Sequence, residues 1–457
     1  MSPWVGLGLR CRRGFARVVP DPFAIAVALV VVVGIVALAF GRAPLDVVRD
    51  FAGAAGLWKL LVFTMQMCTM LVLGTALAEA PAVQRGIVRA VALARSPRML
   101  VAVTAFVAIA LSLLNWSLGL VGGALLAREA GRAAVARGWK LHYPILCAAG
   151  YTGLMTWHGG LSGSAPLKVA TEAGMVEVLG PTLAAAAGGP IALSQTIFGP
   201  LNLFVSGGLL LLGPLVLAAM TPREGEDPEP AAPPADRIQD AAAQDEAPPT
   251  STIERLERSP VVTWALSLVM ALAIGAWLAD RGIAQLGFDE VNLLLWCAAL
   301  VLHGRPDRFV AACEKGVRGC TGIILQFPLY GGIMGMMNGA GISTALSQSF
   351  AGAGAGAFAV LTFVAAGLLN LFVPSGGGQW AVQGPILVEA ALKIGVDLPT
   401  VVMAMAYGDQ WTNMLQPFWA LPLLAITGVR ARDIIGYTTI WMVVGGAWIV
   451  TGLLLLS

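Results

Sequence analysis

An acidic side chain stands alone in an apolar stretch of the second half of the chain. Asp409 follows the uncharged segment Val401–Gly408, whereas the other acids of this half lie near the ends of apolar segments. A carboxylate in such surroundings is costly and is retained when it has a partner or a task. We therefore expect Asp409 to bind a cation or to carry a proton. The alternative is an aspartate that only bonds to N–H groups at a helix break.

Two segments rich in glycine and serine interrupt apolar runs and cannot stay regularly helical. Glycine lets the backbone approach a ligand closely, and a helix that begins at a break presents unpaired N–H groups and a positive dipole end. These features suit a carboxylate, so we expect substrate binding here, although serines can instead bond to the backbone of their own helix. The residues are Ser162, Gly163 and Ser164 in the first segment and Ser375, Gly376, Gly377 and Gly378 in the second.

Further polar residues accompany these breaks. The neutral ones can orient a carboxylate without a fixed charge, and they are Asn115, Asn370, Gln379, Gln383, Thr412, Asn413 and Gln416. Asn115 and Asn370 can instead cap helices. His158 can titrate or contact the substrate, or it can be a packing residue. Lys168 can pair with a carboxylate, but a lysine at a helix end more often extends to the membrane edge or pairs there.

The composition shows what kind of element must position these residues. Of the 457 residues, 57% are hydrophobic and 12% charged, with a mean hydropathy of +0.79. A soluble domain carries about 25% charged residues, so soluble enzymes, nucleic-acid binders and disulfide-rich secreted domains are excluded. The six cysteines form no CxxC motif, and we find no metal site or nucleotide-binding loop. The chain is predicted to be an all-α polytopic membrane protein.

Apolar runs of about 20 residues indicate membrane spans. The basic N-terminus is expected to be cytoplasmic and to precede an uncleaved first span. Residues 221–259 are rich in proline, alanine and acids, and are predicted to form a disordered cytoplasmic linker between the transmembrane halves 1–220 and 260–457. The candidate spans are 22–41, 57–79, 187–219, 260–279, 288–303, 319–338 and 434–456.

Two further apolar segments are predicted to be re-entrant hairpins. Residues 99–127 are flanked by basic residues on both sides, which favours entry from and return to the cytoplasm with Asn115 near the tip. The alternative is one ordinary span that violates the charge rule. Residues 355–392 break at Pro374–Gln379 and lack such flanks, which suits a hairpin open to the outside. The basic flanks of the first segment are Arg95, Arg98, Arg128, Arg132, Arg137 and Lys140.

The two halves share an order of features. Gly150–Leu167 and Ala406–Leu423 align without gaps and share four residues, and Leu113–Asn115 matches Leu368–Asn370. Each half thus runs from a hairpin to a broken helix. Hairpins that open to opposite faces imply an inverted repeat, an architecture typical of secondary transporters with binding sites at the bilayer midplane. We expect roughly nine transmembrane helices plus the two hairpins.

Four motifs in order resemble the short-chain fatty acid transporter family. They are NWSLGLVGGALLAREAGR (115–132), TWHGGLSGSAPL (156–167), VPSGGGQWAVQGPI (373–386) and YGDQWTNMLQPFWALPLL (407–424). The resemblance covers nearly the whole chain. It implies uptake of carboxylates such as butyrate or acetoacetate across the inner membrane, with the carboxylate held by paired hairpins and broken helices. His158, Lys168 and Asp409 depart from the family pattern, which has a small residue, an apolar residue and Glu there.

The resulting interpretation is a secondary transporter of short carboxylates, driven by a proton or sodium gradient at Asp409. It needs no cofactor, contacts lipid, and by analogy forms a homodimer. One alternative is a permease of the same architecture for dicarboxylates or other organic anions, which would carry more fixed positive charge than Lys168. The other is a membrane-embedded enzyme that uses His158 with Ser162 or Ser164. The enzyme is disfavoured because no acid stands nearby in the sequence.

Overall fold

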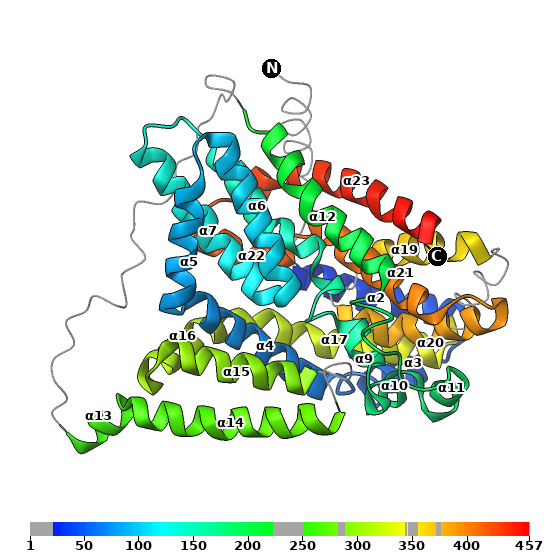
Figure 1. Cartoon of the computed structure of the whole chain (residues 1–457). Coiled ribbons are helices and arrows are strands. Elements are labelled where there is room, and N and C mark those ends of the chain that lie inside the picture. Colours follow the sequence, from blue (N-terminus) through cyan, green and yellow to red (C-terminus); the bar gives the residue numbers. More distant parts are fainter. Residues whose placement is uncertain are drawn as a thin grey trace.

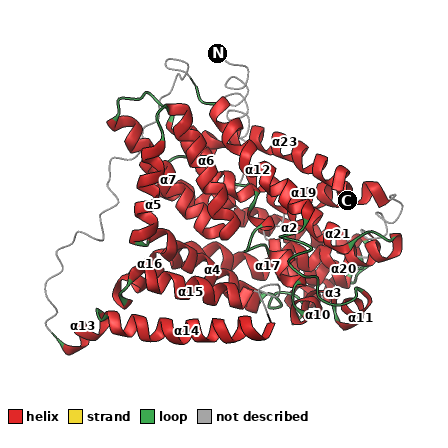
Figure 2. Cartoon of the chain, viewed as in Figure 1, coloured by secondary structure: helices red, strands yellow, loops and turns green. Residues whose placement is uncertain are grey.

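The computed structural model describes residues 22–222, 251–281, 288–342, 345, 355–371 and 376–456 (Figure 1). These residues are helical with connecting loops and contain no strand (Figure 2), which confirms the all-α fold class. Proline opens many helices, including α5, α6 and α12, because its missing N–H would have no partner in the first turn. Of the predicted linker 221–259, residues 223–250 lie outside the described residues, and their disorder stays a prediction, whereas Thr252–Glu257 at its end are helical and not disordered.

The helices of the first half are α2 (Pro22–Ala39), α3 (Pro44–Ala52), α4 (Leu61–Glu79), α5 (Pro81–Leu93), α6 (Pro97–Leu114), α7 (Trp116–Ala136), α8 (Tyr143–Tyr151), η1 (Thr152–Met155), η2 (Trp157–Gly159), α9 (Ser164–Val169), α10 (Glu172–Leu179), α11 (Pro181–Ala186) and α12 (Pro200–Ala219). After the short α13 (Thr252–Glu257), those of the second half are α14 (Pro260–Arg281), α15 (Phe288–His303), α16 (Pro306–Val317), η4 (Arg318–Cys320), α17 (Thr321–Gly339), α19 (Ala355–Asn370), α20 (Gly376–Ile394), α21 (Leu398–Thr412), η5 (Asn413–Leu415), α22 (Pro417–Thr427) and α23 (Ala431–Leu456).

Several helices are long and apolar enough to cross a membrane. Within the described ranges five meet this condition, or six if α4 and α5, which are bent by 62°, form one span. The total of about nine spans stays a prediction. The expected span 187–219 is too long, because its helix α12 begins only at Pro200. The apolar side chains of α14 face outward, with Trp264, Leu268 and Leu272 more than half exposed.

Both predicted hairpin segments are helix pairs. In the first, α6 and α7 pack against each other on either side of Asn115, whose backbone is extended. Asn115 Oδ1 accepts from the N–H of Leu118 at 2.9 Å, so this residue caps α7. The second pair is α19 and α20, and its connection 372–375 lies outside the described residues. The side of the membrane to which each pair opens stays a prediction.

Each pair is followed by a helix that breaks. In the first half α8 passes through η1 and η2 and an irregular stretch before α9 begins at Ser164. In the second half α21 passes through η5 to α22, with Gln416 extended between them. The order of hairpin and broken helix is therefore the same in both halves, while their inversion stays a prediction.

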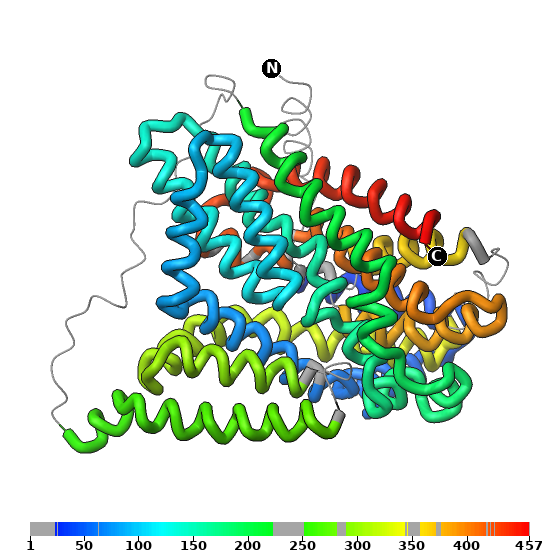
Figure 3. Tube along the Cα trace, viewed as in Figure 1, coloured from blue at the N-terminus to red at the C-terminus, as the bar shows by residue number. Residues whose placement is uncertain are grey.

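The two halves are intimately packed. α7 packs on α22, α12 on α23, and α9 on both α20 and α21. Figure 3 shows α9–α11, from the end of the first half, beside α20 of the second half. Along the lower part of the view α4, α15 and α14 lie in a row (Figure 1). The helix breaks of both halves consequently meet inside the bundle.

Candidate functional site

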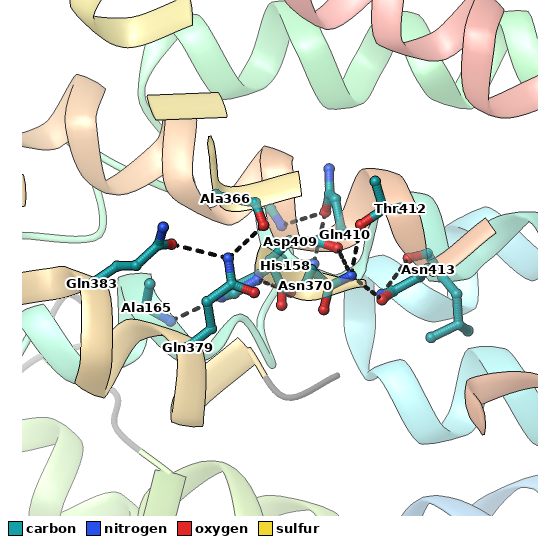
Figure 4. A network of polar contacts seen from close by, with 12 residues as sticks. His158, Ala165, Ala366, Asn370, Gln379, Gln383, Asp409, Gln410, Thr412 and Asn413 are labelled. Carbon is teal, nitrogen blue, oxygen red and sulfur yellow. Dashed lines mark hydrogen bonds and ion pairs between the residues drawn. The ribbon is translucent and has the colours of Figure 1, made fainter. Parts of the chain in front are cut away.

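A buried histidine–aspartate pair joins the two halves at their breaks. Nδ1 of His158 lies 2.7 Å from Oδ2 of Asp409, and these side chains are 0% and 1% exposed (Figure 4). His158 comes from η2 in the broken helix of the first half, and Asp409 from the end of α21 in the second. Asp409, which stands alone in its apolar segment, thus has a partner, His158, that is 251 positions away in the sequence.

The contacts of the imidazole determine its tautomer. The backbone N–H of Ala165 donates to His158 Nε2 at 3.0 Å, so Nε2 is an unprotonated acceptor. In the neutral ring the proton is therefore on Nδ1, which donates to Asp409. The indole of Trp157 stacks on the same ring with centroids 4.5 Å apart. These contacts with Asp409, Ala165 and Trp157 fix the orientation of the His158 ring.

Gln410 holds the backbone of the broken helix of the first half by hydrogen bonds. Its Oε1 accepts from the N–H groups of His158 and Gly159 at 3.0 and 3.3 Å. Asn202 of α12 completes this support, because its Nδ2 donates to the carbonyl of Gly159 at 2.8 Å while its Oδ1 accepts from Tyr407 at 3.1 Å. These contacts hold the irregular segment of the first half against α21 and α12.

The glycine-rich break of the second half lies against the His158–Asp409 pair. A Cβ added to Gly376, the first residue of α20, would stand 2.8 Å from Cε1 of His158 and 3.1 Å from Oδ2 of Asp409. The N-terminus of α20 therefore approaches the carboxylate of Asp409, where its dipole favours negative charge. Gly377 and Gly378 follow in the buried first turn of α20, and Ser375 lies outside the described residues.

A second polar cluster surrounds Asn370 at the end of α19. Its Nδ2 donates to the Asp409 carbonyl at 2.5 Å, to Thr412 Oγ1 at 3.0 Å and to Asn413 Oδ1 at 2.9 Å (Figure 4). Gln416 donates to the Asn370 carbonyl. The predicted residues Asn370, Thr412, Asn413 and Gln416 are thus brought together, and they tie α19 to the break after α21.

The predicted residues of the first half make contacts of a different kind. Ser162 Oγ accepts from the N–H of Trp116 at 2.8 Å and so joins the break to the tip of the α6–α7 pair. Gly163 is buried, and a Cβ there would overlap the carbonyl of His158, so glycine is needed for this close approach. Ser164 is fully buried, and its Oγ has no hydrogen bond to a described residue.

Two predicted residues point elsewhere. Lys168 Nζ contacts Glu177 Oε2 at 2.6 Å, and Glu177 is half exposed, so the lysine pairs towards the edge of the protein. Gln379 Nε2 donates to the Ala366 carbonyl at 2.7 Å and to Gln383 Oε1 at 3.0 Å, which links α20 to α19 (Figure 4). The alternative reading of Lys168 as a helix-end pair agrees with this geometry.

Buried polar atoms around the breaks are left without described partners. Such atoms are costly in a bilayer and mark places where a ligand, an ion or water can bind. The donors among them are suited to a carboxylate and the acceptors to a cation. The donors are Asn115 Nδ2, Trp157 Nε1, Ser164 Oγ and Gln410 Nε2, and the acceptors are Asn370 Oδ1, Gln379 Oε1, Asp409 Oδ1 and Gln416 Oε1.

Three tryptophans form an aromatic cluster beside these groups. The rings of Trp116, Trp157 and Trp419 lie with centroids 5.2–6.5 Å apart. Trp380, Trp411 and Trp419 stand beside the breaks in the sequence, a position that suits an apolar lining for a short acyl tail. Of these, Trp411 instead packs on Phe363 and donates to the Met442 carbonyl at 2.8 Å. The cluster therefore draws two of its members from the first half.

Sequence reasoning missed the partner of His158 and several supporting residues. It stated that no acid stood near His158, but Asp409 contacts it through the fold. Nε2 of His158, the atom that would deprotonate a serine in a catalytic triad, instead accepts from Ala165. The missed supports are Gln410, Asn202, Tyr407 and Tyr151, and the hydroxyl of Tyr151 donates to the carbonyls of Asn413 and Gln416 at 2.9 and 3.2 Å. For Gln410, its place beside Asp409 in an apolar segment was a usable signal.

Comparisons with known proteins agree with this architecture. The family model "Short chain fatty acid transporter" matches residues 6–456. A protein of Escherichia coli is 36% identical over 449 residues, covering 97% of this chain and 98% of its own length. A protein of Haemophilus influenzae is 35% identical over 428 residues, covering 92% and 93%. Both relatives bear the name "Putative short-chain fatty acid transporter".

Two solved transporters share the fold at low sequence identity. The Alcanivorax borkumensis YdaH transporter superposes with a TM-score of 0.53 at 16% identity, covering 95% of this chain and 99% of the other. Neisseria gonorrhoeae MtrF superposes with a TM-score of 0.50 at 16% identity, covering 98% and 97%. The protein is a multi-pass membrane protein with a transporter fold. By its family match and its relatives, this chain belongs to the short-chain fatty acid transporter family.

Proposed function

We propose that this protein transports short-chain monocarboxylates, such as butyrate or acetoacetate, across the cytoplasmic membrane, and that an ion gradient drives this transport. The observation that carries the proposal is the carboxylate of Asp409, buried where α20 begins and both broken helices meet. A fixed anion at this place repels a second carboxylate unless a cation neutralises it. Binding of the ion therefore favours binding of the substrate, and binding of the substrate favours binding of the ion. Coupled transport requires this reciprocity.

The substrate carboxylate is expected at the neutral donors of the site. The N–H or O–H groups of Asn115, Trp157, Ser164 and Gln410 that have no described partner can orient a carboxylate. The Trp116–Trp157–Trp419 cluster offers an apolar surface for a short acyl tail. We infer alternating access from the predicted inverted repeat, because rocking of two related halves exposes one site to each side in turn.

The charge of the site favours monocarboxylates over dicarboxylates. A second substrate carboxylate would need a fixed cation, and Lys168, the cation that the sequence offered for this role, is engaged with Glu177. The dicarboxylate permease stays the alternative function. The membrane-embedded enzyme is not supported, because in the described part of the chain no serine is hydrogen-bonded to the imidazole of His158.

Counterflow in proteoliposomes tests the proposal. Vesicles loaded with unlabelled butyrate, acetoacetate or succinate are each diluted into the same acid in radiolabelled form, with protein-free liposomes as the control for passive entry of the undissociated acids. We expect protein-dependent exchange of butyrate and acetoacetate but not of succinate. Exchange of succinate alone would establish the dicarboxylate permease, and no exchange of any of the three would refute carboxylate transport.

A further inference from the structure

The hydrogen bonds of the buried pair leave one atom of Asp409 without a described partner. Oδ2 accepts from His158, whereas Oδ1 is buried and accepts no hydrogen bond from a described residue. Resting on the proposed function, we propose that the coupling ion is a proton, that it binds to Oδ1 of Asp409 together with the substrate, and that His158 is a positioning residue that stays neutral.

The ring of His158 has no free position for a second proton. Nδ1 carries the proton that it donates to Asp409, and Nε2 accepts from the N–H of Ala165. A proton on Nε2 would point at that N–H, so two donors would face each other and the first turn of α9 would have to move. Stacking of Trp157 on the ring and complete burial oppose such a movement. The next proton therefore goes to the carboxylate.

Among the described residues, no charged side chain of the packed elements contacts Asp409. η2 packs on α6, α7, α9 and α21, and α21 packs also on α19, α20 and α23. In the described part of the chain, His158 is the ionisable group that contacts Asp409. The other ionisable side chains of these elements with known partners pair elsewhere: Tyr407 with Asn202, Lys168 with Glu177, Glu389 with Lys393, Glu129 with Arg132, and Asp433 with Arg430.

Protonation of Oδ1 changes the site in two ways that favour the substrate. The new O–H bond removes the negative charge that repels an incoming carboxylate, and it converts an acceptor into a donor. The bond from His158 Nδ1 to Oδ2 is kept, so the carboxyl group does not rotate. One proton and one carboxylate anion then cross together, and the step carries no net charge.

Proton uptake on binding is the direct test. Butyrate is titrated calorimetrically into the purified full-length protein in two buffers of different ionisation enthalpy, with and without sodium. We expect the wild type to take up about one proton per bound butyrate, independently of sodium, because one carboxylate is neutralised. Asp409→Asn keeps the shape without the titrating group, and should bind butyrate without proton uptake. Glu389→Gln, an exposed change on α20, serves as the matched control and should behave as the wild type.

The role of His158 is tested by a conservative variant and by spectroscopy. His158→Asn places an amide N–H near the position of Nδ1 and should keep proton uptake and its pH dependence, whereas His158→Ala should shift the pH profile of binding. If His158→Asn does not fold, the wild type itself gives the answer. Its three histidines can be labelled with nitrogen-15, and the His158 signal should stay that of a neutral imidazole when butyrate binds, while infrared difference spectra show a new protonated carboxyl band.

The outcomes separate this inference from the proposed function. Butyrate binding that requires sodium and takes up no proton would overturn proton coupling while leaving carboxylate transport intact. An imidazolium signal on binding, or loss of proton uptake in a butyrate-binding His158→Asn variant, would place the proton on the histidine and overturn the assignment to Asp409. Absence of any butyrate binding or counterflow in the wild type would instead refute the proposed function.

Discussion

Gly376 lies directly against the imidazole of His158, with its ideal Cβ position 2.8 Å from Cε1. The same position is 2.8 Å from the Trp157 ring and 3.1 Å from Oδ2 of Asp409. A methyl group here cannot be accommodated without moving either the first turn of α20 or the buried pair. The glycine is thus needed for close approach and not for an unusual backbone angle.

The first prediction concerns this contact. Gly376→Ala should reduce butyrate counterflow at least about tenfold, because overpacking of a dense site costs about 1–3 kcal/mol. Expression in the membrane should remain normal. Gly86→Ala on α5 is the control, since a Cβ there meets nothing within 4 Å, and it should leave counterflow unchanged. Wild-type counterflow in Gly376→Ala would show that the tip of α20 does not take part in the site.

Local signals in the sequence predicted the elements better than their contacts. Asn115 follows an apolar run and precedes a glycine-rich one, which indicates a break with an N-cap, and it caps α7 in the structure. The glycines around Ser162–Ser164 and the proline that follows likewise predicted the break at this segment. The expected span 187–219 was too long because hydropathy does not register where a helix starts, whereas Pro200 does.

The partners within the site could not be predicted in this way. The cost of a buried acid identified Asp409, but the group that stabilises it stands 251 positions away. No periodicity connects His158 to Asp409, because their contact depends on how the two broken helices pack. For the same reason the sequence did not show that Ser162 accepts a hydrogen bond from the backbone N–H of Trp116.

The second prediction concerns Lys168. Because its ammonium group pairs with the half-exposed Glu177, Lys168→Gln should change the KM for butyrate by no more than about threefold, in line with the value of about 0–1 kcal/mol for such pairs. Initial rates of counterflow over a range of butyrate concentrations measure this. A rise in KM that is much larger, and that Glu177→Gln does not reproduce, would assign Lys168 to the substrate.

The third prediction concerns the packing of α7 on α8. A Cβ on Gly123 would overlap the carbonyl of Gly150, and a Cβ on Gly150 would overlap that of Gly123. Gly123→Ala should therefore destabilise the protein by about 1–3 kcal/mol, seen as a lower midpoint of thermal unfolding in detergent. Gly207→Ala on α12, where a Cβ meets nothing within 4 Å, should unfold at or above the wild-type temperature. Equal midpoints for both variants would contradict this close packing.

The last prediction concerns the donor that joins α19 to the break after α21. Nδ2 of Asn370 faces three acceptors, the Asp409 carbonyl, Thr412 Oγ1 and Asn413 Oδ1. Asn370→Asp keeps the shape but replaces this donor by a carboxylate oxygen, so acceptors would face acceptors in a buried site. A buried group left without its hydrogen bond costs about 1–3 kcal/mol, and the added charge lies close to Asp409. We expect a lower unfolding midpoint and loss of butyrate counterflow. Tyr407→Phe is the matched control, because Asn202 Oδ1 still accepts from Ser206 at 2.8 Å when the tyrosine hydroxyl is removed, and its effect should be smaller in both measurements. An Asn370→Asp variant that is as stable and active as the wild type would mean that the carboxyl group is protonated in the folded protein and still donates, which a protonated carboxyl band in its infrared spectrum would reveal.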